Sequence, residues 1–181
     1  MQARSYSSEG IILGRASYSE ADRIISLFSK DYGKITLLAK GVRKLKSRKR
    51  GHIEVFNRIK FSAARGKGLD ILTEAEEIES YRKIRSSLQK VSLAYYFTEI
   101  VARTAHDNEV NREIYGLLCL YLKRMESEHS LKKFRLAFVT ELLIRLGYWP
   151  QNKPLSSPDI LLEEVMERKP NSLRVGRQML S

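Results

Sequence analysis

The spacing of apolar residues changes once along this chain, close to residue 81. Up to that point, apolar residues come in short runs of β-favouring types that are bounded by Ser, Asp or Gly. Beyond it, they recur every three to four residues, which is the spacing of one face of an α-helix. This change predicts an α+β chain, with an all-β domain over residues 1–80 and a helical bundle domain over residues 81–181.

The all-β half contains five candidate strands, at residues 8–17, 22–29, 33–40, 53–64 and 69–78. Turn signals separate them, among them DYGK, in which Gly33 can take a positive φ, and RGKG. Five short antiparallel strands predict a small barrel, and a five-stranded OB-fold β-barrel is the leading candidate. An SH3-like barrel has a similar strand count and stays open as an alternative.

The helical half contains four segments with helical spacing, at residues 82–105, 110–125, 131–147 and 158–169. In the first segment, Leu88, Val91, Tyr95 and Ala102 fall near one face, which we expect to be buried. The third segment carries two apolar stripes, and we therefore expect it at the centre of the bundle. The stripes are Leu136, Val139, Leu143 and Leu146, and Leu131, Phe134, Phe138 and Leu142.

Positive charge is concentrated in the first third of the chain. The formal net charge is +12, from 33 Lys and Arg against 21 Asp and Glu. Residues 1–68 hold 16 basic and 5 acidic residues, whereas residues 69–181 hold 17 and 16. Such an excess indicates an anionic partner, such as nucleic acid or an anionic membrane surface.

The densest part of this charge is the stretch AKGVRKLKSRKRG, residues 39–51. Its cations could neutralise several phosphates, each releasing a condensed counterion, although a merely solvated loop is the alternative. Phe28, Tyr32 and Phe56 are candidates for base stacking, but strand aromatics more often pack in the core. The predicted nucleic-acid-binding residues are Lys40, Arg43, Lys44, Lys46, Arg48, Lys49 and Arg50, with Arg65 and Lys67 from the RGKG turn.

Groups that could support catalysis do not converge in this sequence. The three histidines, His52, His106 and His129, are scattered among polar residues without a second ligand at metal spacing. The glycines of RGKG belong to a turn rather than to a strand–loop–helix phosphate site, and the acidic run TEAEEIES suits a solvated face. We therefore predict a protein that is not an enzyme, with no catalytic residue, no metal and no cofactor.

The sequence also gives an expectation about compartment. Cys119 is the one cysteine, so no disulfide can form within the chain and a reducing cytosol is favoured. The first residues are polar, and no apolar run approaches the roughly 18 residues that a membrane span needs. We expect a soluble, cytoplasmic, nucleoid-associated protein without a membrane partner.

The order of motifs resembles the RecO family of bacterial recombination mediators. The similar segments run along most of the chain: EGIIL (9–13), residues 18–35, LTEAE (72–76), residues 94–103, residues 134–150 and RKPNSLR (168–174). The most specific element is the family pattern AKG-R-xx-S-R-xx-G. Here it is formed by Ala39, Lys40, Gly41, Arg43, Ser47, Arg48 and Gly51.

One departure concerns the segment that follows GYWP. Many family members carry a four-cysteine zinc ribbon there, whereas this chain has QNKPLSS, without a cysteine. The resemblance therefore gives no reason to expect zinc, and the last helix is expected to follow directly.

The resemblance implies a function in DNA repair by the RecF pathway. It implies an OB-fold that binds single- and double-stranded DNA without sequence specificity and promotes strand annealing. It also implies that the chain works with RecR to load RecA on DNA coated by single-strand binding protein (SSB). The acidic C-terminal tail of SSB would bind the helical domain, where Lys132, Lys133 and Arg135 beside Phe134 are candidate contacts.

Two other functions fit the composition. An RNA- or ribosome-associated OB-fold protein is favoured almost equally by charge alone, and the resemblance is what demotes it. A scaffold whose helices bind partners, with the basic stretch serving only solubility, is the third hypothesis.

Overall fold

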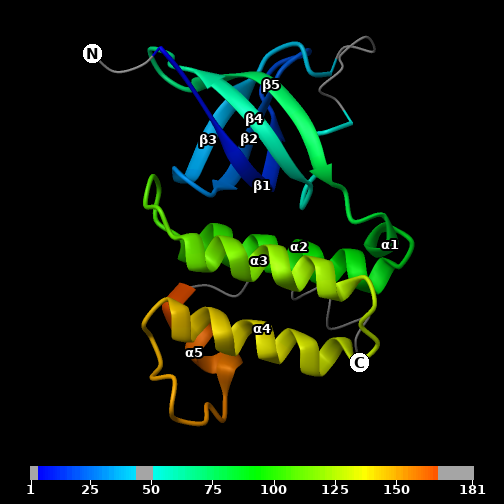
Figure 1. Ribbon diagram of the computed structural model, residues 1–181, viewed down its shortest axis with the longest axis vertical. Coiled ribbons are helices and arrows are strands. Elements are labelled where there is room, and N and C mark those ends of the chain that lie inside the picture. The colour runs from blue at the N-terminus through cyan, green and yellow to red at the C-terminus, as the bar shows by residue number, and fades with distance from the viewer. Residues whose placement is uncertain (1–3, 44–50, 167–181) are drawn as a thin grey trace. The chain divides into compact units, whose positions relative to one another are not determined.

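The computed structural model describes residues 4–43 and 51–166, and they divide into two compact units (Figure 1). The first unit combines residues up to Ser80 with the later segment Ala105–Tyr115. The second contains Tyr81–Thr104 and the chain from Gly116 onward. Each unit is described by itself. Over the described ranges, no helix has both the length and the apolar character that crossing a membrane requires.

Five strands of the first unit close into a barrel. They are β1 (Ser5–Ser17), β2 (Arg23–Ser29), β3 (Gly33–Ala39), β4 (Arg58–Ala64) and β5 (Asp70–Glu79). Their order around the barrel is β1-β2-β3-β5-β4, with β4 returning to pair with β1 (Figure 1). All neighbouring pairs are antiparallel except β3 and β5, which are parallel. This topology confirms the predicted α+β class and the OB-fold rather than the SH3-like alternative.

Strand β1 closes the barrel because it pairs on both of its edges. Its first half, from Ser5 to Ile11, pairs with β4, and Gly10 to Ser17 pair with β2. The register with β2 shifts between Ile12 and Gly14, as at a β-bulge, which bends a strand and increases its twist. Inward-facing apolar side chains fill the interior, among them Ile11, Ile25, Leu27, Leu37 and Phe61. Burial of each contributes about 1.5–3 kcal/mol.

The fourth strand begins at Arg58, five residues later than the sequence pattern predicts. Residues 53–57 instead form a turn whose residue Phe56 has a φ of 59°, outside the β region. The Phe56 amide donates to the Ile12 carbonyl at 2.8 Å, and the Ile12 amide donates to Asn57 at 3.0 Å. The apolar residues that suggested a strand are buried here under the barrel's end, so a core position was mistaken for a strand position.

The segment Ala105–Tyr115 covers the turn between β2 and β3. The Asn108 amide donates to the Lys34 carbonyl at 2.9 Å, and Arg112 forms an ion pair with Asp31 at 2.8 Å. The contact is close at Gly33, where an added Cβ would lie 2.1 Å from the Glu109 carbonyl oxygen. Gly33 also has a φ of 69°, so both backbone conformation and space require glycine.

The second unit is built from helices around an aromatic core. They are α1 (Arg82–Arg85), α2 (Leu88–Thr104), α3 (Arg112–Met125, of which Gly116 onward belongs here), α4 (Leu131–Arg145) and α5 (Pro158–Met166). Phe97 of α2 stacks on Phe138 of α4 at 3.8 Å between ring centroids. Tyr121 of α3 packs edge-on against Phe138 at 5.1 Å. The predicted central role of α4 agrees with its buried residues, which include members of both stripes.

The predicted buried face of α2 is wrong. Leu88 is 65% exposed and Tyr95 is 42% exposed, whereas Phe97, Ile100 and Val101 are fully buried. The prediction treated residues 82–105 as one continuous helix, but α1 ends at Arg85 and α2 starts anew at Leu88. That break precedes Leu88 and does not alter the faces within α2. The buried residues Leu93, Phe97 and Ile100 form a second apolar stripe at helical spacing, and the prediction chose the other stripe.

We expect Gly33→Ala to destabilise the protein by more than about 2 kcal/mol, because a left-handed φ and a backbone clash act together. Gly14→Ala is the matched control: it lies in the same barrel, and its added Cβ meets nothing within 4 Å. Urea unfolding followed by far-UV circular dichroism measures both. Equal stabilities of the two variants would contradict the role given to the Gly33 contact.

Candidate nucleic-acid interface

The predicted cations divide between described and undescribed residues. Lys44, Lys46, Arg48, Lys49 and Arg50 lie outside the described residues, so their place in a binding surface stays a prediction. The other four, Lys40, Arg43, Arg65 and Lys67, all lie on the barrel unit, and all are exposed.

The start of the basic stretch is fastened to the turn between β1 and β2. The Gly41 amide donates to the Asp22 carboxylate at 2.8 Å, and the Arg43 amide donates to the Ala21 carbonyl at 3.0 Å. The Arg43 guanidinium donates to the Ser19 carbonyl at 2.9 Å. The chain therefore enters the basic stretch from a defined position at one end of the barrel.

Tyr18, on the same turn, is an exposed aromatic residue that the sequence reasoning missed. Its side chain is 61% exposed, and its amide donates to the Asp22 carbonyl at 3.1 Å. By contrast, Phe28 and Phe56 are fully buried, in agreement with the favoured expectation that they pack in the core rather than stack on bases. The signal for Tyr18 was its polar neighbourhood, SYSEAD, which places an aromatic ring in a turn rather than in a strand.

Arg65 and Lys67 occupy the turn between β4 and β5. Leu37 of β3 pairs with Asp70, and Leu38 with Ile71, in parallel register. Because the strands are parallel, this turn lies beside the N-terminal half of β3, whereas Lys40 follows its C-terminal end. The structure thus places the two groups of cations at opposite ends of the short β3–β5 contact.

Arg65 is held in place, unlike an ordinary surface cation. Its guanidinium lies over the Tyr6 ring at 4.6 Å from the centroid and forms an ion pair with Asp70 at 3.2 Å. The Tyr6 hydroxyl donates to the same Asp70 carboxylate at 2.8 Å. Burial, together with this hydrogen bond, raises the pKa of the Tyr6 phenol far above its usual value, so the phenol stays neutral.

The outer face of β5 carries the opposite charge. Glu74 and Glu76 are exposed there, and in the β4–β5 ladder they lie opposite Ser62 and Lys60. The acidic run that the sequence assigned to a solvated face is therefore part of the barrel wall. A polyanion is repelled from this strand and attracted to the basic turns.

The helical unit contains the residues suggested as contacts for the acidic tail of a partner protein, and only some of them are exposed. Phe134 is buried and packs against Tyr121 at 4.9 Å. Arg135 makes a bidentate ion pair with Asp159 at 2.6 and 2.8 Å, which links α4 to α5. Lys132 and Lys133 are exposed. Of the three suggested basic residues, Arg135 is thus engaged with Asp159, while the contact role of the two lysines stays a prediction.

Chemistry that needs converging groups has little support in the described part of the chain. Within residues 4–43 and 51–166, no group of three or more His, Cys, Asp or Glu side chains is placed to hold a metal ion. His106 and His129 are exposed on different units. The expected lack of catalysis, of a metal and of a cofactor stays a prediction.

Comparison with known proteins gives matches along most of the chain. The family model described as recombination protein O N terminal matches residues 1–81, and the one described as recombination protein O C terminal matches residues 85–153. Curated relatives named DNA repair protein RecO include one from Roseiflexus sp., 30% identical over 93% of this chain and 59% of the relative. Another, from Dehalococcoides mccartyi, is 36% identical over 81% of this chain and 58% of the relative. The chain thus spans less than two thirds of the length of these relatives.

We expect Tyr18→Ala to weaken binding of a single-stranded oligonucleotide by about fivefold or more, because one base–aromatic stack contributes about 1–3 kcal/mol. Tyr148→Ala is the matched control, since Tyr148 is 47% exposed but lies on the helical unit. Fluorescence anisotropy at fixed salt measures both. Equal affinities for wild type and both variants would remove Tyr18 from the interface.

Proposed function

The chain belongs to the RecO family, and we propose that it is a DNA-binding recombination mediator that binds single- and double-stranded DNA without sequence specificity. The observation that carries the proposal is the charge asymmetry, +11 of the net +12 within residues 1–68. These residues build most of the barrel, and Lys40, Arg43, Arg65 and Lys67 are exposed at or near its turns. We expect cations on turns to contact phosphates rather than base edges. Phosphate contacts carry no sequence information, so we expect no sequence preference.

We also propose that the basic surface promotes annealing of complementary strands. Two phosphate backbones repel each other, and a dense cationic segment reduces this repulsion while they approach. Annealing needs no nucleotide hydrolysis, so the proposal requires no catalytic group. In the RecF pathway such a protein would act with RecR in loading RecA on DNA coated by SSB.

For the helical unit we propose a protein-binding function, with the acidic C-terminal tail of SSB as its partner. Support comes from Lys132 and Lys133, which are exposed in the first turn of α4. We expect Lys132→Glu with Lys133→Glu to weaken binding of a labelled peptide with this tail by at least about threefold, as loss of two exposed ion pairs predicts. The control is Lys83→Glu with Lys153→Glu, which changes the net charge equally. Equal weakening by both pairs would contradict a defined tail site.

The DNA-binding proposal is tested by the salt dependence of single-stranded oligonucleotide binding. If the basic stretch supplies about five phosphate contacts, the log–log slope is near −3.5, at roughly −0.7 per contact. Reversing Lys44, Arg48 and Arg50 to Glu should make the slope shallower by about 2. Reversing Arg82, Lys83 and Lys153 to Glu changes the net charge of the chain by the same amount, but on the helical unit. This control variant should keep a slope near the wild-type value.

Two outcomes would overturn the proposal. Matched affinity and slope in wild type and the Lys44, Arg48 and Arg50 variant would make the stretch a solvated loop. Tighter binding of single-stranded or structured RNA than of single-stranded DNA would favour the RNA-associated alternative.

A further inference from the structure

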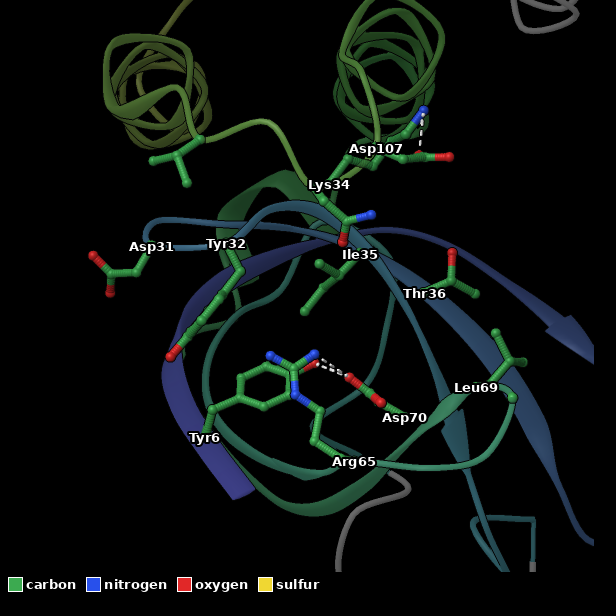
Figure 2. A pocket seen from close by; sticks show the side chains of 13 residues that line it. Tyr6, Asp31, Tyr32, Lys34, Ile35, Thr36, Arg65, Leu69, Asp70 and Asp107 are labelled. Atoms are coloured by element: carbon green, nitrogen blue, oxygen red, sulfur yellow. Dashed lines mark hydrogen bonds and ion pairs between the residues drawn. The ribbon is translucent and has the colours of Figure 1, made fainter. Parts of the chain in front are cut away.

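The barrel has a short seam between β3 and β5. These strands pair only through Leu37 with Asp70 and Leu38 with Ile71. Beside this short contact lies a pocket of about 670 Å³. Its walls come from the start of β1, the β2–β3 turn, the first half of β3, the β4–β5 turn and residues 107–110, all within the barrel unit (Figure 2).

The charged side chains that line the pocket are paired with one another or with a neighbour. Arg65 pairs with Asp70 at 3.2 Å, and Lys34 pairs with Asp107 at 3.1 Å. Asp31 accepts from Arg112 at 2.8 Å and from the Ser8 hydroxyl at 2.7 Å, and these contacts hold the pKa of Asp31 below its usual value. A phosphate here would have to compete with a carboxylate for every cation. The pocket therefore suits an uncharged, planar group better than a phosphate.

Arg65 supplies a planar surface in this pocket. In Figure 2 its guanidinium lies over the Tyr6 ring, with Asp70 at its side, and Tyr32 stands next to Tyr6 at 4.6 Å between centroids. One face of the guanidinium thus rests on an aromatic ring. The side chain is still 49% exposed, which leaves area for a second stacking partner. Because Asp70 and Tyr6 already fix the plane, little side-chain entropy is lost when a ligand stacks on it.

We propose that this pocket accepts an unpaired nucleobase of single-stranded DNA, stacked on the Arg65 guanidinium. Arginine planes and aromatic rings are the surfaces on which proteins stack unpaired bases. The exposed side chains of Thr36 and Asn108 also line the pocket and offer hydrogen-bonding groups to a base edge. A base inside a duplex cannot enter, so the pocket distinguishes single-stranded from double-stranded DNA. This assignment rests on the proposed DNA-binding function.

The proposal separates two roles for Arg65 that charge alone does not distinguish. If Arg65 only neutralises a phosphate, lysine should replace it, and single- and double-stranded DNA should be affected alike. If it stacks on a base, lysine should fail as alanine does, because an ammonium has no plane.

The test measures the affinity of Arg65→Lys and Arg65→Ala for single-stranded and duplex oligonucleotides of equal length by anisotropy. We expect the affinity of both variants for single-stranded DNA to fall by about fivefold or more, which corresponds to the lower end of the free energy of one base stack. Their affinity for duplex DNA should stay within about twofold of the wild-type value. Lys67→Ala, on the same turn, is the phosphate-type control and should weaken both forms equally. Retained single-stranded affinity in Arg65→Lys would overturn the stacking role.

A second variant tests the pocket without changing the β4–β5 turn, whose conformation the Arg65 substitutions could alter. Thr36→Trp places a large side chain at the pocket from β3 without altering Arg65, Tyr6 or Asp70. It should reduce single-stranded but not duplex affinity, and unchanged single-stranded affinity would overturn the pocket assignment. If wild type binds both forms with a steep salt slope while these variants bind normally, only this inference fails. If wild type binds neither form, the proposed function itself fails.

Discussion

The closure of the barrel by β1 determines the rest of this unit. This single strand pairs with β4 through its first half and with β2 through its second half, and its register with β2 shifts between Ile12 and Gly14. Because β1 closes one side completely, β3 and β5 need to meet along only two residue pairs. The seam left between them is where Tyr6, at the start of β1, comes to lie beside Tyr32 and Arg65.

Charge is segregated on the same barrel. Lys40, Arg43, Arg65 and Lys67 are exposed at or near its turns, while β5 presents Glu74 and Glu76 outward. This separation limits the paths that a polyanion can take over the surface. It also means that attraction of the phosphates and contact with the bases come from different parts of the barrel. Attraction to phosphates would come from the cations of the turns, and contact with bases from the seam pocket, where the charged side chains are paired. The two contributions differ in salt dependence, since only the first releases counterions.

Much of the architecture could be predicted from local patterns. The change of period near residue 81, the turn at Gly33 and the double stripe of α4 are signals that neighbouring residues carry by themselves. The errors arose where an outcome depends on distant residues. Phe56 is in the core because residue 12 pairs with its turn, and the buried stripe of α2 is the one whose Phe97 stacks on Phe138 of α4.

The candidate site shows the same division. Clustering of cations is visible in the sequence, but the position of Arg65 over Tyr6 is not, and neither is the hydrogen bond from Tyr6 to Asp70, which lies 64 positions further along the chain. No local pattern indicates that the Arg65 guanidinium is held over an aromatic ring. Likewise, Tyr18 lies in the exposed turn between β1 and β2, whereas Phe28 lies inside the barrel, and where β1 ends is decided by its pairing with β2.

The central claim is that DNA lies on the barrel unit, and photo-crosslinking of single-stranded DNA to the full chain tests it most directly. Thymine replaced by a photoreactive analogue, followed by mass spectrometry of the crosslinked peptides, reports which residues the strand touches. The account predicts crosslinks within residues 18–22, 40–50 and 65–70, and none on the outward face of β5. Crosslinks confined to residues 116–166 would place the DNA on the helices and contradict the account.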